Sequence, residues 1–145
     1  MVIVEMVEVT DEIVRAFQRL IPQLTNHSTP PDREALAHMA ASPDTVVFLA
    51  WEPDEKGEIV GSASLAIAYS PTGAHGWIED VVVDQAARGR GVGRMLTQAL
   101  LDKARALGLK QVYLTSRPSR MAANQLYQSM GFVRRETNVY RFDLD

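Results

Sequence analysis

Residues 78–96, IEDVVVDQAARGRGVGRML, constrain the fold more than any other part of the sequence. The segment opens with β-branched residues typical of a strand and then reaches a run of glycines and arginines. Apolar residues follow at helical spacing: Val92, Met95, Leu96, Ala99, Leu100, Ala104 and Leu107. This spacing predicts a helix over 92–107 that lies on a sheet, so the chain is expected to have an α/β fold.

The glycine-rich loop between this strand and helix predicts a binding site for a pyrophosphate. Glycines let the backbone turn tightly, so that successive N–H groups point into one concavity. The helix N-terminus adds unpaired donors and the positive end of its dipole. Arg88, Arg90 and Arg94 supply positive charge around the loop. The plain alternative, a surface turn, is disfavoured by the strand and helix on either side.

Two nucleotide-binding motifs do not fit this loop. A P-loop ends in Gly-Lys-Ser/Thr, which is absent here, so nucleotide hydrolysis is disfavoured. A dinucleotide-binding fold places its glycines after the first strand and an acidic residue about 20 residues further on. In this sequence the loop follows the fourth predicted strand, and basic and apolar residues occupy the downstream position.

The rest of the chain completes a mixed α/β domain. Patterning predicts strands over 2–9, 45–51, 58–69, 76–83, 111–115, 132–135 and 139–144, and helices over 11–24, 32–41, 92–107 and 120–130. Thr10 is the expected N-cap of the first helix, Asp32 is expected to begin the second, and Gly108 and Gly131 are expected to end the last two helices. There is no repeat or linker, so residues 1–145 are expected to form a single domain.

Composition excludes several classes of site. The chain has no cysteine, which rules out disulfides, thiolate metal sites and a cysteine nucleophile. His27, His38 and His75 show no metal-ligand spacing, so no metal is expected. No apolar run approaches the roughly 20 residues of a membrane span, and the start lacks the basic region of a signal peptide. We therefore expect no membrane partner and a cytoplasmic location.

Charge is distributed unevenly along the chain. Residues 1–80 hold 4 basic and 13 acidic side chains (−9), whereas residues 81–145 hold 11 basic and 5 acidic ones (+6). The excess of basic groups around the glycine loop favours an anionic ligand over a merely solvated surface. An overall charge of −3 with only three lysines disfavours nucleic-acid binding.

Two motifs together resemble the GNAT superfamily of N-acetyltransferases. The family's pyrophosphate motif, Gln/Arg-x-x-Gly-x-Gly/Ala, is matched by Arg88, Gly91 and Gly93, and its Leu-Tyr-x-x-x-Gly-Phe signature is matched by residues 126–132. One helix and one strand separate the two motifs, as in the family. The resemblance implies a mixed, mostly antiparallel sheet of six or seven strands flanked by about four helices, with a cleft between the fourth and fifth strands. It also implies acetyl-CoA as co-substrate.

The resemblance also implies which residues bind the cofactor. The pantetheine arm is expected to bind backbone groups of Val81 and Val83, one of whose N–H groups could also stabilise the carbonyl oxygen. The phosphates are expected to bind the loop: Arg88, Gly89, Arg90, Gly91, Val92, Gly93 and Arg94. Relatives often carry an asparagine seven residues before the signature tyrosine, but Arg120 stands there in this chain. Asn124 is expected to take over that role, and Arg117 and Arg120 are left to bind phosphates or an acidic substrate.

Acetylation of an amine needs a base, because alkylamines have pKa values near 10. Strand alternation places Trp77, Glu79, Val81 and Val83 on one face and Asp80 on the other, where a structural role is expected. The resemblance implies a base on the face of Trp77 and Glu79, so Glu79 is the candidate base, directly or through an ordered water; the alternative is that it shapes the amine pocket or pairs with an arginine. Tyr127 is the candidate general acid and a further cofactor contact; the alternative is a core aromatic.

These inferences predict transfer of an acetyl group from acetyl-CoA to a primary amine of a small molecule or peptide. The acidic first half favours a cationic amine. The Ile-Glu-Asp run at residues 78–80 leaves an amino-sugar-phosphate acetyltransferase as an alternative. A non-catalytic acetyl-CoA sensor is the alternative from another class. A homodimer is expected through edge pairing of residues 133–144.

Overall fold

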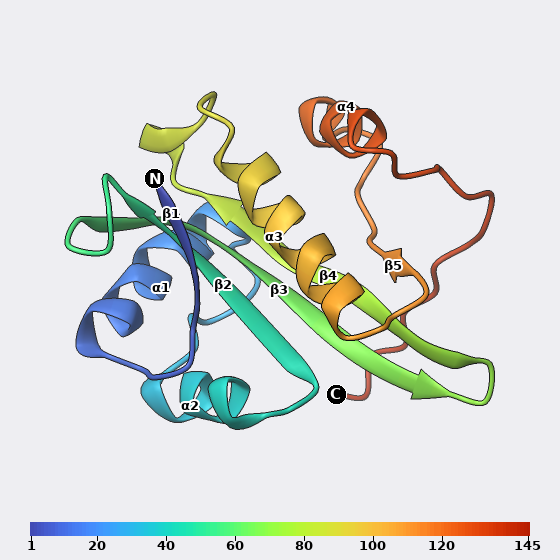
Figure 1. Cartoon of the computed structure of the whole chain (residues 1–145), viewed down its shortest axis with the longest axis horizontal. Coiled ribbons are helices and arrows are strands. Elements are labelled where there is room, and N and C mark those ends of the chain that lie inside the picture. Colours follow the sequence, from blue (N-terminus) through green and yellow to red (C-terminus); the bar gives the residue numbers. More distant parts are fainter. The chain divides into compact units, whose positions relative to one another are not determined.

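A five-stranded sheet in the order β1-β2-β3-β4-β5 organises the fold of this computed structural model, which describes residues 1–145 (Figure 1). The strands are β1 (Val2–Glu5), β2 (Thr45–Glu52), β3 (Glu58–Ser70), β4 (Gly73–Val83) and β5 (Val112–Tyr113). The first four pair antiparallel, whereas β5 pairs parallel to β4. The chain divides into two units, residues 1–114 and 115–145, and the whole sheet lies in the first.

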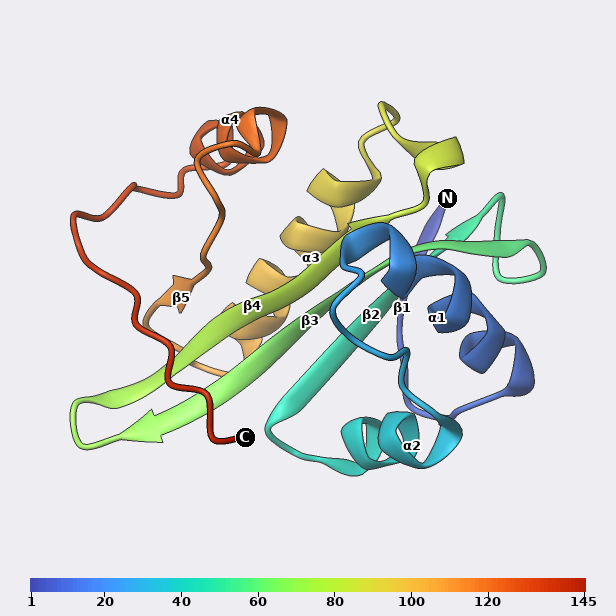
Figure 2. The same cartoon turned by 180° about the vertical axis from the view of Figure 1, so that it is seen from behind.

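Helices cover both faces of the sheet. Helices α1 (Asp11–Leu24) and α2 (Arg33–Ala41) lie on one face, and α3 (Val92–Ala106) lies on the other (Figures 1 and 2). The predicted cap at Thr10 is confirmed, because Thr10 Oγ1 accepts a hydrogen bond from the Ile13 N–H at 3.2 Å. Asp32, predicted as the first residue of its helix, is instead the N-cap of α2, and its Oδ1 accepts a hydrogen bond from the Ala35 N–H at 2.8 Å. These bonds satisfy amides that have no partner inside the helix.

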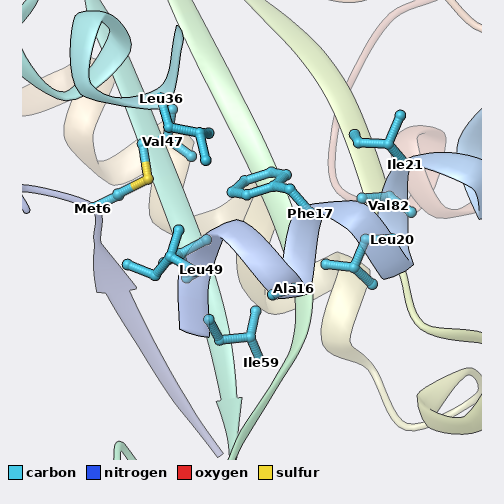
Figure 3. Packing of buried hydrophobic residues seen from close by; sticks show 11 residues of the cluster. Met6, Ala16, Phe17, Leu20, Ile21, Leu36, Val47, Leu49, Ile59 and Val82 are labelled. Atoms are coloured by element: carbon cyan, nitrogen blue, oxygen red, sulfur yellow. The ribbon is translucent and has the colours of Figure 1, made fainter. Parts of the chain in front are cut away.

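The core on the α1 face is built from apolar side chains of the helices and the strands. Phe17 and Leu20 of α1 pack with Leu49, Ile59 and Val82 of the sheet (Figure 3). On the α3 face, Gly61 of β3 allows close approach, since an added Cβ would lie 3.1 Å from both Leu96 Cδ1 and Val92 Cγ1. The two apolar layers hold β4 between them and fix its position.

The second unit, residues 115–145, contains one helix, α4 (Met121–Ser129). Residues 131–145 form no helix or strand, so the strands predicted over 132–135 and 139–144 are wrong, and the sheet has five strands rather than six or seven. The apolar residues of this segment remain exposed, from 74% at Val139 to 91% at Leu144. An alternating pattern makes a strand only when a partner and a packed face stabilise it, and a lone hairpin is at best marginal.

The predicted α/β class and four helices are otherwise confirmed, with small shifts in the bounds. The strand β1 ends at Glu5 rather than continuing to Val9. Met6 is buried in the core, and its N–H makes the last bond of this edge, to the Val47 carbonyl at 2.8 Å. That residues 1–145 act as one domain stays a prediction.

Candidate active site

The edge of β4 opens where the cleft was expected. Pairing between β4 and β5 is confined to Gly76–Val112 and Trp77–Tyr113, whereas β4 continues to Val83. Past that end, the Asp84 N–H bonds to the Val60 carbonyl of β3 at 2.8 Å. Since backbone groups of successive residues point to opposite edges, those of Val83 point away from β3 toward the free edge. Val81 lies in the irregular part of β4, between the register pairs of Glu79 and Val82, so the pantetheine contacts expected at Val81 and Val83 stay a prediction.

The glycine loop leads directly from this edge into α3. Gly89 and Gly91 have φ angles of 81° and 80°, and a Cβ added at either would meet nothing within 4 Å. The left-handed backbone therefore requires glycine for its conformation, and the space beside it is open. Gly91 is the N-cap of α3 and has no side chain to bond the amides of the first turn.

The start of α3 supplies donors to that open space. Its first helical bond runs from the Met95 N–H to the Gly91 carbonyl at 3.0 Å. The amides of Val92 and Gly93 come before that bond and have no acceptor within the helix. The Val92 side chain is only 2% exposed, so its contribution to a ligand is limited to the backbone. Together with the helix dipole, these features fit a phosphate group.

Two arginines of the loop are held by the protein's own acceptors. Arg88 Nε donates to the Val83 carbonyl at 3.3 Å, on the free edge of β4. Arg90 Nη1 forms an ion pair with Glu52 Oε1 at 2.9 Å, at the end of β2. Arg94 lies in the first turn of α3. A phosphate ligand would therefore compete with existing contacts of Arg88 and Arg90, a feature that the sequence did not predict.

A β-bulge at Asp80 changes the faces predicted for β4. The register pairs Ser64 with Glu79 and Ser62 with Val82, so β4 has one more residue than β3 between these pairs. Asp80 has a φ of 51°, the left-handed conformation that aspartate tolerates better than most residues. The predicted shared face holds for Trp77 and Glu79, but Val83 lies on the opposite face because the bulge shifts the alternation.

Glu79 keeps an exposed side chain on the α1 face of the sheet. Partial burial raises the pKa of its carboxyl, and the neighbouring negative charge of Asp80 raises that pKa further. A carboxyl with a raised pKa is a stronger base once ionised, which suits proton removal from an ammonium group.

Three aromatic side chains lie on the same face of the sheet as Glu79, toward the start of β4. Trp77 stacks on Tyr113 of β5, with ring centroids 5.1 Å apart and planes inclined by 27°. His75 meets Tyr113 edge-on at 5.6 Å. The sequence analysis missed this group, although Trp77 and Tyr113 both fell on predicted strands. Their pairing depends on the parallel register of β5, which the sequence pattern does not define.

In the second unit, the signature Leu-Tyr-x-x-x-Gly-Phe forms the end of α4. The Phe132 N–H bonds to the Tyr127 carbonyl at 3.0 Å, and the Gly131 N–H bonds to the Gln128 carbonyl at 3.1 Å. Gly131 has a φ of 100°, which completes a Schellman motif. The ring of Phe132 also meets that of Tyr127 edge-on at 5.7 Å. The motif thus fixes the position of Tyr127 on its helix.

Tyr127 itself is buried. Burial raises the pKa of its hydroxyl, and the positive charge of Arg120 partly offsets this effect. The phenol therefore stays protonated at neutral pH, as a proton donor must.

Asn124 uses its side-chain amide within the second unit. Its Nδ2 donates to the carbonyls of Arg117 at 2.9 Å and Arg120 at 2.8 Å, so it braces the turn that leads into α4. Only its carbonyl oxygen is left for a ligand. The cofactor contact predicted for Asn124 stays a prediction, and the structure adds a positioning role.

Residues 8–132 match the Acetyltransferase (GNAT) family. This chain belongs to the GNAT family. The glucosamine 6-phosphate N-acetyltransferase 1 of Oryza sativa subsp. japonica is 32% identical over 137 residues, which cover 88% of this chain and 78% of that protein. A crystal structure of a Trypanosoma brucei acetyltransferase superposes with a TM-score of 0.73 at 32% identity, covering 98% of this chain and 99% of that chain. The family and its α/β fold, as predicted, are confirmed.

Other GNAT relatives are longer than this chain. A mycothiol acetyltransferase of Amycolatopsis mediterranei is 36% identical over 92 residues, and the match covers 59% of this chain but only 30% of that protein. None of the helices in the GNAT chain combines the length and apolar character that a membrane span requires. No three side chains of His, Asp or Glu are grouped so that they could hold a metal ion.

Proposed function

We propose that this GNAT chain transfers the acetyl group of acetyl-CoA directly to a primary amine of a small molecule or peptide, within a ternary complex. The observation that carries the proposal is the arrangement along β4. Glu79 stands on one face of this strand, while its free edge at Val81 and Val83 leads into the glycine loop and the N-terminus of α3. One strand thus connects a base to a site that fits phosphates and an amide-bearing arm.

Each residue has a defined part in the proposed reaction. Glu79 accepts a proton from the acceptor ammonium, directly or through water, so that the amine nitrogen can attack the thioester carbonyl carbon. The new N–C bond forms, the C–S bond breaks, and the nitrogen loses its second proton to water, from which the tyrosine is later reprotonated. Tyr127, which burial keeps protonated by raising its pKa, gives its proton to the departing thiolate. An N–H on the free edge of β4 stabilises the charge on the carbonyl oxygen.

The test combines calorimetry of acetyl-CoA binding with release of free thiol across a panel of amines. Tyr127→Phe should lower the rate of thiol release at least tenfold while the dissociation constant for acetyl-CoA stays the same, since only the proton donor is removed. Tyr140→Phe is the matched control, because Tyr140 is 89% exposed in the same unit. Binding without thiol release from any amine would favour the sensor alternative instead.

An amino-sugar phosphate is the second candidate acceptor, supported by the identity to the rice glucosamine 6-phosphate N-acetyltransferase 1. The charge of −9 over residues 1–80 instead supports a cationic amine. Comparison of glucosamine 6-phosphate with glucosamine separates them: a cationic-amine enzyme should prefer the unphosphorylated sugar at low salt. A strict requirement for the phosphate would reject the cationic preference.

A cytoplasmic homodimer without nucleic-acid partners belongs to the same proposal. The exposed apolar side chains of the C-terminal segment support self-association: Val133, Val139, Tyr140, Phe142 and Leu144. Sedimentation equilibrium should give twice the chain mass of 16.1 kDa. Retention on heparin at low salt would contradict the absence of a nucleic-acid surface.

A further inference from the structure

The face of the sheet that α1 covers is apolar and buried at one end of β4, and carries side chains outside the core at the other end. The apolar core on this face includes Val82 of β4 and Val47 of β2. Toward the start of β4, the same face carries Glu79 and then Trp77, which are outside that core. Helix α1 therefore covers one end of the face, and a second kind of surface begins at Glu79.

This second surface combines large side chains on β4 with small ones on β3. The register places Ser64 opposite Glu79, Ala66 opposite Trp77 and Ala68 opposite His75. Directly opposite residues of neighbouring strands share a face, so these pairs lie side by side. The three β3 residues are partly exposed. The small side chains of β3 therefore lie lower than the large side chains of β4 beside them, which leaves a step along this face of the sheet.

On the side away from β3, a residue of β5 packs against Trp77 and supports it. Tyr113 stacks on Trp77 at 5.1 Å, and the Tyr113 hydroxyl donates to Gln111 Oε1 at 2.8 Å. The indole is thereby supported on its β5 side, while its β3 neighbour is only the methyl group of Ala66. A broad flat partner can lie over Ala66 against the indole, with Glu79 two residues further along the strand.

We propose that Trp77, supported by Tyr113, is a specificity-determining residue that holds the ring of an acceptor whose primary amine is carried on or next to a six-membered ring. The inference rests on the proposed function, because it concerns the acceptor of that reaction. A ring covers the indole face with many contacts at little loss of conformational freedom, whereas a linear amine must be straightened to make fewer. Glu79 then meets the amine, and Ser64 offers a hydroxyl opposite Glu79.

The experiment compares kcat/KM for two ring-bearing amines, glucosamine and 2-phenylethylamine, with two linear ones, butylamine and 1,4-diaminobutane. The wild type should prefer at least one ring-bearing amine. Trp77→Ala should lower kcat/KM for that amine about tenfold and change the linear amines less than about twofold, in line with the usual strength of an aromatic contact plus its buried area. Trp77→Phe should restore part of the loss. If Trp77→Ala lowers kcat/KM more for glucosamine, the natural ring is a sugar. If it lowers kcat/KM more for 2-phenylethylamine, the ring is aromatic.

The control is Tyr69→Ala, because Tyr69 is an aromatic residue of β3 that is 72% exposed and lies on the opposite face. Equal losses for ring-bearing and linear amines, or a wild-type preference for linear amines, would overturn the inference and leave acetyl transfer intact. Acetyl-CoA binding without thiol release from any amine would instead reject the proposed function, and the inference with it. If Trp77→Ala does not fold, Tyr113→Leu serves as the second variant, since it removes the stacking partner of the indole while Trp77 itself is kept.

Discussion

Glu79 and Val82 lie on the same face of the sheet although three positions separate them, because the bulge at Asp80 takes up the extra residue. In a regular strand these two residues would point to opposite faces. The bulge lets one strand bury Val82 under α1 while it keeps Glu79 on the same side, toward the aromatic surface. The position of the candidate base therefore depends on the conformation of its neighbour.

The first prediction concerns the pH dependence of the reaction. Asp80→Asn should shift the acidic limb of the kcat/KM profile to lower pH, because the charge of Asp80 raises the pKa of Glu79 and a base acts only when deprotonated. Asparagine tolerates the φ of 51° at this position, so the bulge is retained. Glu58→Gln, an exposed acid at the start of β3, should leave the profile unchanged. A limb that does not move would reject Glu79 as the titrating base.

The second prediction tests whether glycine is needed in the loop for its backbone conformation or because a larger side chain would clash. Gly89→Ala should weaken acetyl-CoA binding, because a left-handed residue other than glycine costs about 1–2 kcal/mol and shifts the loop. Gly89→Asn should weaken it less, since asparagine adopts this conformation more readily. The added side chain itself meets nothing within 4 Å. Calorimetry that finds the asparagine variant weaker than the alanine variant would argue for a steric role instead.

The third prediction concerns the ion pair between Arg90 and Glu52. Glu52→Gln should free Arg90 for a phosphate and tighten acetyl-CoA binding at low salt. The gain should be at most about fivefold, because an exposed ion pair contributes about 0–1 kcal/mol. It should fade as salt screens the interaction. Glu55→Gln, in the same β2–β3 connection, is the control, and weaker binding by Glu52→Gln would show that the pair positions the loop productively.

The fourth prediction concerns the end of α4. Gly131→Ala should slow thiol release and lower stability by about 1–2 kcal/mol, because the Schellman motif that fixes Tyr127 needs a left-handed residue at this position. Gly131→Asn should be milder in both respects. The measurements are the urea midpoint and the rate at saturating substrates. Lower stability with an unchanged rate would mean that the motif does not position Tyr127.

Local signals in the sequence predicted most of the first unit. The cap at Thr10, the helix stripe after the glycine loop and the β-branched run before it each depend on neighbours close in sequence. The same local pattern marked the glycine loop as a phosphate site, and the family resemblance then identified the cofactor and added Tyr127 as a candidate. What the sequence could not define was register, because the bulge at Asp80 and the stacking of Trp77 on Tyr113 depend on which residues of two strands meet.

The strands predicted in the C-terminal segment are absent for a related reason. Residues 139–144 alternate in a way that favours a strand, but alternation alone specifies no partner. The arginines of the loop show the same limit. Their charge predicted a phosphate site, while the acceptors that hold Arg88 and Arg90 lie on β4 and β2 and could not be read from the motif.

The hydrogen bond from Arg88 to Val83 has a consequence for solubility as well as for binding. The backbone of β4 beyond Trp77 is not paired by β5, and an unpaired strand edge is a place where other chains can add and aggregate. A guanidinium bonded to the Val83 carbonyl places a charge on that rim and blocks one of its acceptors. Arg88 thus acts as a gatekeeper, so that its loss should reduce the yield of soluble protein even where no cofactor is present.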